Sequence, residues 1–239
     1  MELKVNALTL RAIDYKDNDK ILTLLSAEKG KITAGIKGVK KAGAKLKFAA
    51  QPFCFAEFIL SCKGDKYTVI GASENESFYD LRTDINKLYA ASAVCEVASA
   101  LSYEFAEGQE IFYLAIKTLS KMCVGDECSA LIEFLLNALC VSGYGIALDD
   151  CAECGCSLTD QPKMRFDFNL GAFTCWDCGD GDGASLTTYH TLRAASGKSY
   201  NKNCLTDDGN KRALRLLREY LTFKTDERFL SFSEYVRLL

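Results

Sequence analysis

The chain has 239 residues, of which 49% are hydrophobic and 26% charged, and its formal net charge at pH 7 is −3. This composition is typical of a globular protein with one large domain or two to three small ones, and it excludes a largely disordered chain. The first five residues lack the pattern of a signal peptide. The most apolar stretch, residues 131–148, is interrupted by Glu133 and Asn137, so we expect a buried helix there and no contact with a membrane.

The first eighty residues contain five β-rich runs separated by turns: 5–13, 21–26, 31–36, 53–60 and 67–72. The tetrapeptide Lys63-Gly-Asp-Lys66 predicts a hairpin turn between the last two. Five short strands in this span favour a small closed barrel of the OB-fold type. Residues 35–45 would then form a long, mobile, lysine-bearing loop between the third and fourth strands.

From Asp84 onward, apolar residues recur at helical spacing. Two further helical patterns cover 110–122 and 129–141, with Gly108 and Gly125 as breaks. After a cysteine-rich stretch, residues 179–185 read as a flexible exit, and helices over 186–195 and about 210–223 close the chain. The expected fold class is therefore α+β and multidomain, with an OB-fold barrel, a helical domain and an inserted four-cysteine zinc module.

Two Cys-x-x-Cys pairs, Cys151 with Cys154 and Cys175 with Cys178, form the strongest motif of the chain. This spacing predicts a structural Zn²⁺ site, because four protein ligands leave no position for substrate or water. Cys156 adds a fifth thiol that could replace Cys154. The alternative is that the pairs are two unrelated sets of buried thiols.

The number and placement of the remaining cysteines indicate a compartment and a structural role. Twelve cysteines without an export signal indicate a reducing compartment, so we expect a cytoplasmic protein with mostly free thiols. Six cysteines lie within or beside apolar segments and are interpreted as small core residues: Cys54, Cys62, Cys95, Cys123, Cys128 and Cys140.

Positive charge is concentrated in residues 29–47, which hold seven lysines and no acidic residue. Of the 29 basic side chains, 22 then remain in the rest of the chain against 32 acidic ones. Such a segment could neutralise phosphates without reading sequence, although it could also be an ordinary solvated surface. Phe48 and Phe53 flank the segment and could stack on bases, but at least one is expected in the barrel core. The expected nucleic-acid contacts are Lys31, Lys37, Lys40, Lys41, Lys45 and Lys47.

Two other features of the sequence bear on function: a basic helix and the lack of a catalytic motif. Lys211, Arg212, Arg215 and Arg218 follow one another along the late helix, and a solvated helix face is favoured over a docking face for DNA or an acidic partner. The chain has a single histidine, His190, and no convincing carboxylate pair, phosphate loop or deaminase motif. We therefore expect a protein that is not an enzyme.

Motifs along the whole chain resemble those of the RecO family of bacterial DNA repair and recombination proteins, from about Leu8 to Leu230. The N-terminal motifs are Tyr15-Lys-Asp-Asn-Asp19, Leu22-Thr-Leu-Leu25, Glu28-Lys-Gly-Lys-Ile32, Gly35-Ile-Lys-Gly-Val-Lys-Lys41, Gln51-Pro-Phe53 and Ser77-Phe-Tyr-Asp-Leu-Arg82. The C-terminal motifs are Gly143-Tyr-Gly145, Cys151-Ala-Glu-Cys-Gly155, Gly171-Ala-Phe-Thr-Cys-Trp-Asp-Cys178 and Ala213-Leu-Arg-Leu-Leu-Arg-Glu-Tyr-Leu221. It is their order that makes the resemblance specific.

The resemblance implies a recombination mediator. Such proteins bind single- and double-stranded DNA, anneal complementary strands and help load RecA onto strands coated with single-strand-binding protein. They work with RecR and, in many bacteria, RecF, in the cytoplasm and at the nucleoid during repair. Lys37, Lys40 and Lys41 occupy the family's basic loop. The four cysteines occupy its zinc positions, and we expect the zinc module not to touch DNA.

The expected domains are 1–80 (OB-fold, DNA-binding), 81–149 (helical, first part), 150–184 (zinc module) and 185–239 (helical, C-terminal part). The rival hypothesis is a protein-interaction scaffold that docks RecR and single-strand-binding protein and has little DNA binding of its own.

Overall fold

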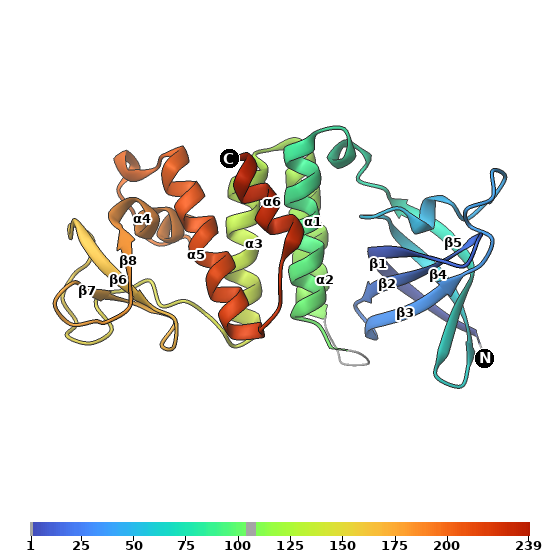
Figure 1. Ribbon diagram of the computed structural model, residues 1–239, viewed down its shortest axis with the longest axis horizontal. Coiled ribbons are helices and arrows are strands. Elements are labelled where there is room, and N and C mark those ends of the chain that lie inside the picture. The colour runs from blue at the N-terminus through green and yellow to red at the C-terminus, as the bar shows by residue number, and fades with distance from the viewer. Residues whose placement is uncertain (1, 104–108) are drawn as a thin grey trace. The chain divides into compact units, whose positions relative to one another are not determined.

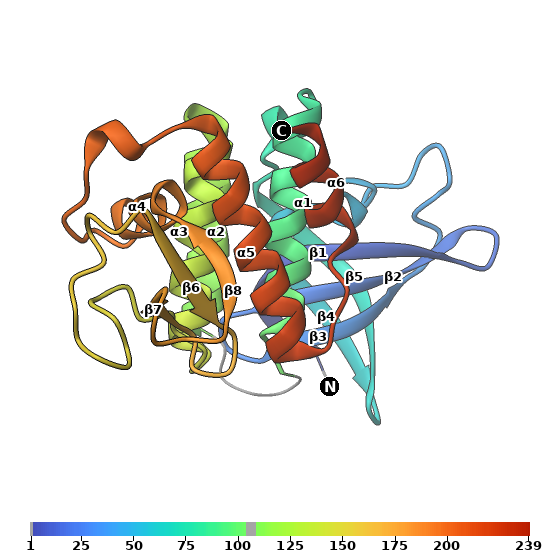
Figure 2. The ribbon, with the colours of Figure 1, turned by 60° about the vertical axis from the view of Figure 1, so that its left-hand side comes forward.

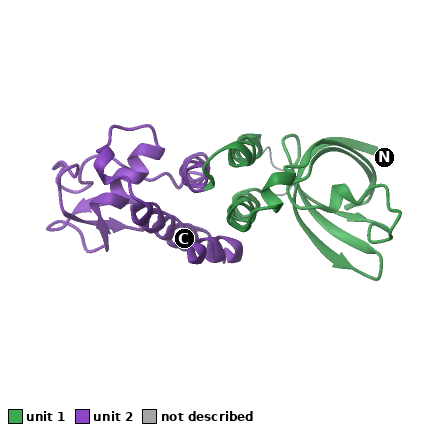
Figure 3. Cartoon of the chain, turned by 90° about the horizontal axis from the view of Figure 1, so that it is seen from above, with its two compact units in different colours: residues 1–127 green, residues 128–239 purple. Residues whose placement is uncertain are grey.

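The computed structural model describes residues 2–103 and 109–239, so the predicted break at Gly108 lies outside the described residues. The chain divides into two compact units, Met1–Glu127 and Cys128–Leu239 (Figure 3). The finer division into four domains at residues 80, 149 and 184 stays a prediction. In the described part of the chain, no helix combines the length and the apolar character that crossing a membrane requires.

The first unit begins with a closed five-stranded barrel (Figure 1). Its strands are β1 (Glu2–Tyr15), β2 (Asp19–Ser26), β3 (Gly30–Ile36), β4 (Phe55–Lys63) and β5 (Lys66–Glu76). They are arranged in the order β1-β2-β3-β5-β4, and β1 closes the barrel by pairing with β4. Only β3 and β5 pair in parallel among these strands. The expected barrel of the OB-fold type is confirmed, with five strands at the positions that the sequence predicts.

Two local features allow the barrel to close. The register of β1 against β2 shifts between Thr9 and Arg11, and such a bulge bends a long strand so that it pairs with two neighbours. The predicted hairpin turn is present, because Lys63 pairs with Lys66 across a two-residue loop. Gly64 in this loop has a φ of +60°, a conformation that glycine adopts without steric cost.

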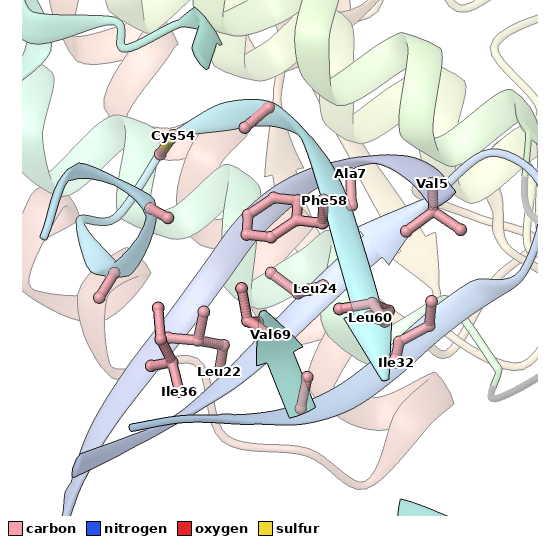
Figure 4. Close-up of a cluster of buried hydrophobic side chains, with 14 of the residues drawn as sticks. Val5, Ala7, Leu22, Leu24, Ile32, Ile36, Cys54, Phe58, Leu60 and Val69 are labelled. Carbon is pink, nitrogen blue, oxygen red and sulfur yellow. The ribbon is translucent and has the colours of Figure 1, made fainter. Parts of the chain in front are cut away.

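The barrel core is built from alternate residues of the strands, which point inward at a period of two (Figure 4). Phe58 and Leu60 of β4 lie among Leu22 and Leu24 of β2 and Val69 of β5, and all five are almost fully buried. β3 and β4 alternate in this way along most of their length, whereas β1 and β2 also contain runs of consecutive buried residues.

Two helices follow the barrel in the first unit: α1 (Ile85–Ala100) and α2 (Gln109–Val124). Asp84 caps α1, because its side chain accepts hydrogen bonds from the backbone N–H groups of Asn86 and Lys87. The two helices pack against each other. Small buried side chains on α1, such as Ala90 and Ala91, suit close packing.

The second unit combines helices with a small sheet (Figure 2). Its helices are α3 (Glu127–Val141), α4 (Leu186–Ala195), α5 (Asp207–Thr225) and α6 (Leu230–Leu238), and α3 starts at the last residue of the first unit. The strands β6 (Lys163–Asp167), β7 (Ala172–Cys175) and β8 (Asp182–Ser185) form a sheet in the order β7-β6-β8. Neither this sheet nor α6 was predicted from the sequence. The flexible exit expected over residues 179–185 is wrong for the last four of them, which form β8.

Aromatic side chains form the centre of the second unit. The ring of Phe166 on β6 lies 5.0 Å from that of Phe173 on β7 and 5.4 Å from that of Tyr220 on α5. Phe173 in turn contacts Tyr189 on α4, at 5.1 Å. The three-stranded sheet is therefore held to α4 and α5 by one continuous core.

None of the twelve cysteines, all of which lie in the described part of the chain, forms a disulfide bond. Of the six expected in the core, Cys54, Cys95 and Cys128 are buried, whereas Cys62 and Cys123 are half-buried. The prediction is wrong for Cys140, which is exposed. Cys140 lies three residues after Asn137 and seven after Glu133, so all three share the outward stripe of α3.

Candidate nucleic-acid surface and thiol cluster

Four cysteine thiols gather at one point of the second unit. Cys151, Cys154 and Cys156 come from the loop before β6, and Cys175 ends β7. Their sulfur atoms all lie within 4.8 Å of one another, and Sγ of Cys154 is 3.9 Å from Sγ of Cys175. Four sulfurs bound tetrahedrally at about 2.3 Å from a metal would be about 3.8 Å apart. The cluster can therefore hold a metal ion.

A tight loop brings the first three thiols together. The carbonyl of Cys151 accepts a hydrogen bond from the backbone N–H of Gly155, and the N–H of Cys151 donates to the carbonyl of Cys156, at 2.9 and 2.8 Å. Gly155 has a φ of +73°, which lets the chain reverse at this point. The N–H of Cys175 donates to Sγ of Cys151 at 3.2 Å, which fixes the end of β7 against the loop.

A second turn carries Cys178. The backbone N–H groups of Cys178 and Gly179 donate to the carbonyl of Cys175, at 3.3 and 3.4 Å. The thiol of Cys178 is exposed, and the neighbouring thiols of Cys175 and Cys154 raise its pKa. Cys178 thus lies beside the cluster.

The surroundings of the thiols favour the thiolate at two positions. Burial alone would raise the pKa of Cys151, but hydrogen bonds from the backbone N–H groups of Cys154, Cys175 and Glu153 lower it to about 6. A hydrogen bond from the Cys178 thiol lowers the pKa of Cys175. The hydrogen bond to Cys154 raises the pKa of Cys156 to about 12. Since the thiolate is the form that binds metal, Cys151 and Cys175 are the best-prepared ligands.

The structure thus brings together three of the four predicted ligands and adds Cys156. The sequence left open whether Cys156 replaces Cys154. In the structure, Cys154 lies within the cluster, and Cys156 and Cys178 are the two thiols that compete for the remaining position. The ligand assignment itself stays a prediction, with five sulfurs available for four positions.

The lysine segment, defined here as residues 37–47, is folded into successive turns. Backbone hydrogen bonds run from Lys41 to Gly38, from Ala44 to Lys41 and from Lys47 to Ala44. The side chain of Val39 is 3% exposed and belongs to the barrel core. The expected long loop between β3 and β4 is present, and local turns and a buried valine attach it to the barrel; its mobility stays a prediction.

The six predicted lysines differ in their surroundings: four are exposed, a fifth is exposed and forms an ion pair, and one is half-buried. Lys37, Lys41, Lys45 and Lys47 are exposed on the lysine segment. Lys40 is exposed as well, but its Nζ forms an ion pair with Asp14 at 2.7 Å. Half-buried Lys31 on β3 donates from Nζ to the carbonyl of Ser99 near the end of α1, at 3.0 Å. Its ammonium group is therefore engaged within the protein.

The two aromatic residues that flank the segment belong to the barrel. Phe53 is 1% exposed, and half-buried Phe48 packs against the core cluster. The expectation that at least one of them is a core residue is confirmed. Neither presents a fully open ring to solvent.

The other predicted features are structural. His190 is 2% exposed; its Nδ1 accepts from the N–H of Asn201, so its Nε2 donates to the carbonyl of Thr159. On the basic face of α5, Arg212 pairs with Asp208 at 2.8 Å and Arg218 with Glu219 at 3.4 Å. Acidic partners of this kind are typical of a solvated helix face.

Comparison with known proteins places this arrangement in a family. The family model described as "Recombination protein O N terminal" matches residues 1–75. The model described as "Recombination protein O C terminal" matches residues 82–231. The chain belongs to the RecO family. The boundary between the two RecO matches falls between the end of β5 and the start of α1.

Curated relatives named DNA repair protein RecO agree with this. That of Desulforamulus reducens is 32% identical over 176 residues, which cover 73% of this chain and 68% of the relative. That of Acetivibrio thermocellus is 28% identical over 186 residues, which cover 77% and 73%. That of Desulfitobacterium hafniense is 33% identical over 176 residues, which cover 72% and 63%. RecO identity supports a role in DNA repair and recombination.

Proposed function

We propose that this protein is a recombination mediator that binds single- and double-stranded DNA and anneals complementary strands. In this proposal it helps to load RecA onto DNA coated with single-strand-binding protein, together with RecR and, in many bacteria, RecF. It acts in the cytoplasm, at the nucleoid during repair. The observation that carries the proposal is the folded lysine segment on the OB-fold barrel of a RecO family member.

The chemistry of the lysine segment suits sequence-independent binding. Each exposed lysine is a point charge on a flexible stem, and it can neutralise a phosphate without contacting a base edge. Because the segment is held by turns and by Val39, its charges keep a defined position on the barrel. Annealing needs two strands brought close together with their charges screened and their base edges free, and such a surface provides this.

The protein is proposed to work without catalysis. Its single histidine is buried, with both ring nitrogens engaged by the backbone, so it cannot reach a substrate as an acid or base. The mediator's task of binding and positioning strands requires no bond to be made or broken.

We propose Zn²⁺ as the metal of the thiol cluster, with Cys151, Cys154 and Cys175 among its ligands and either Cys156 or Cys178 as the fourth. Thiolate sulfur is a preferred zinc ligand, and a site closed by four sulfurs stabilises a fold. Here it would fix the loop that carries Cys151 and Cys154 onto β7 and, through Phe173 and Tyr189, onto α4.

The test is the salt dependence of DNA binding, measured by fluorescence anisotropy. The variant Lys37→Glu/Lys41→Glu is compared with the charge-matched control Lys117→Glu/Lys121→Glu on α2. We expect the first pair to weaken binding to single strands and to reduce the slope of log K against log salt by about 1.4, since each lost phosphate contact contributes about 0.7. The control pair should leave this slope unchanged.

An unchanged slope in the Lys37→Glu/Lys41→Glu variant would contradict the assignment of the surface. If the wild-type protein does not bind DNA at low salt, the scaffold hypothesis is favoured instead. DNA contact would then depend on a partner such as RecR.

A further inference from the structure

An exposed aromatic residue lies at the turn between β1 and β2. Tyr15 ends β1 and pairs with Asp19 at the start of β2, so three residues connect the two strands. The side chain of Tyr15 is 48% exposed, and the Nζ atom of Lys16 lies 5.3 Å from the centre of its ring. Ile13, two residues earlier on the same face of β1, is 43% exposed. An apolar surface with a cation beside it therefore faces solvent here.

This turn is attached to the lysine segment. The carboxylate of Asp19 accepts a hydrogen bond from the backbone N–H of Gly38, at 2.8 Å. The carbonyl of Asn18 accepts one from the N–H of Lys40, at 3.1 Å, and the carboxylate of Asp14 binds Nζ of Lys40. The turn around Tyr15 is thus bonded to the lysine segment at three points, and the two together are called the combined surface.

The charge of this combined surface is positive. Residues 14–20 and 37–47 together contain seven lysines and three aspartates. Two of the aspartates, Asp14 and Asp19, are already bonded to groups of the lysine segment. The surface suits a polyanion, but lysines alone would accept single strands and duplexes alike.

An exposed ring changes this selectivity. In a duplex the bases are stacked on one another, whereas a base of a single strand can lie flat on an aromatic side chain. Stacking tolerates any sequence, because every base has a flat face. We propose that Tyr15 stacks on a base of single-stranded nucleic acid while the neighbouring lysines hold its phosphates. This inference rests on the proposed function and adds the residue that favours single strands over duplexes.

The test uses three ligands of equal length: single-stranded oligo-dT, a duplex, and a strand of tetrahydrofuran abasic residues that has phosphates but no bases. Wild-type protein is compared with Tyr15→Ala and Tyr15→Phe, and with Tyr113→Ala, which removes another exposed tyrosine of the same unit. Tyr15→Ala should weaken oligo-dT binding by about 5- to 100-fold and change duplex and abasic binding by less than about twofold. Tyr15→Phe and Tyr113→Ala should bind like the wild type.

A second variant gives a direct signal. The chain has one tryptophan, Trp176, so Tyr15→Trp in a Trp176→Phe background carries a single indole at the turn. Its fluorescence should be quenched by oligo-dT and not by the abasic strand.

Three outcomes would overturn the inference. An equal loss of affinity for all three ligands in Tyr15→Ala would show that Tyr15 only supports the fold of the surface. No loss for any ligand would exclude stacking while leaving DNA binding by the lysines intact. Wild-type protein that binds none of the ligands would overturn the proposed function and this inference with it.

Discussion

The Nζ atom of Lys40 lies 2.7 Å from Oδ2 of Asp14, and this ion pair joins the lysine segment to the turn between β1 and β2. Lys20 approaches the same carboxylate, with its Nζ 3.6 Å from Oδ1. One of the lysines expected to bind phosphate therefore also holds the surface together. The lysines of the segment differ in their roles even though they are close in sequence.

The ion pair of Lys40 with Asp14 leads to a prediction about the pKa of the Asp14 carboxyl group. The hydrogen bond from Lys40 lowers the pKa of Asp14 below its ordinary value of 3.8. Because the pKa of the folded state is depressed, the pair stabilises the fold above pH 3.8 and loses this effect only as the pH falls through the lower folded-state value. Titration of the Asp14 carboxyl by NMR should show this low pKa in the wild type and a higher one in Lys40→Ala. Lys47→Ala is the control, and a pKa of Asp14 that is the same in all three proteins would contradict the assignment.

The barrel could be predicted from the sequence because strands such as β3 and β4 alternate buried with more exposed residues. Alternation of apolar and polar residues reports such burial directly, and a turn such as 63–66 marks where one strand ends. The small sheet of the second unit gave a weaker signal, because only β6 alternates buried with more exposed residues, and it has five residues. All four residues of β7 are buried and β8 has only four residues, so neither strand alternates over a useful length.

The candidate sites were predictable by composition but not by geometry. The lysine segment and the cysteine pairs stand out in the sequence, whereas the ion pair of Lys40 and the bond of Lys31 to Ser99 join residues 26 and 68 positions apart. In the sequence, Tyr15 stands out only as the first residue of a family motif. Its exposure depends on where β1 ends, which the sequence placed two residues too early.

Gly179 is predicted to be essential for the turn that carries Cys178. A Cβ atom at Gly179 would lie 2.0 Å from Oγ1 and 2.9 Å from Cβ of Thr174, which is 1% exposed. Gly179→Ala should therefore lower the free energy of unfolding by about 1–3 kcal/mol, as overpacking does. Denaturant unfolding measures this, with Gly183→Ala as control, because a Cβ there meets only Trp176 at an ordinary 3.8 Å. Adding Thr174→Ala to the Gly179→Ala variant should recover part of the lost stability. Equal stability of Gly179→Ala and Gly183→Ala would refute the clash.

Phe166 is predicted to be the main apolar link between the sheet and α5. It is 1% exposed and its ring contacts Phe173 and Tyr220. Phe166→Ala should lower the free energy of unfolding by about 3–5 kcal/mol, the usual result of emptying a buried aromatic position. Phe223→Ala, which removes a ring that is 53% exposed, should cost less than about 1 kcal/mol. Similar losses in both variants would show that the sheet does not depend on this core.

The five thiols lead to a prediction about redundancy in metal binding. Cys151 and Cys175 are the cluster thiols whose surroundings favour the thiolate, so Cys151→Ala or Cys175→Ala should abolish the binding of one zinc ion per chain. The melting temperature should fall by roughly 5–10 °C, since each kcal/mol of stability corresponds to about 2–8 °C in domains of this size range. Chelation of the metal from the wild-type protein should lower the melting temperature by a similar amount.

Cys156 and Cys178 should each be dispensable alone. Cys156 lies within 4.8 Å of the other cluster sulfurs, and Cys178 lies at the turn that follows Cys175, so we expect that either can complete a tetrahedral site when the other is absent. Elemental analysis should find one zinc ion per chain in Cys156→Ala and in Cys178→Ala, and none in the double variant. Loss of zinc in one single variant would identify that residue as the sole fourth ligand and refute redundancy. Full zinc content in the double variant would show that three cysteines suffice, and the site would then keep an open position that a purely structural zinc ion does not need.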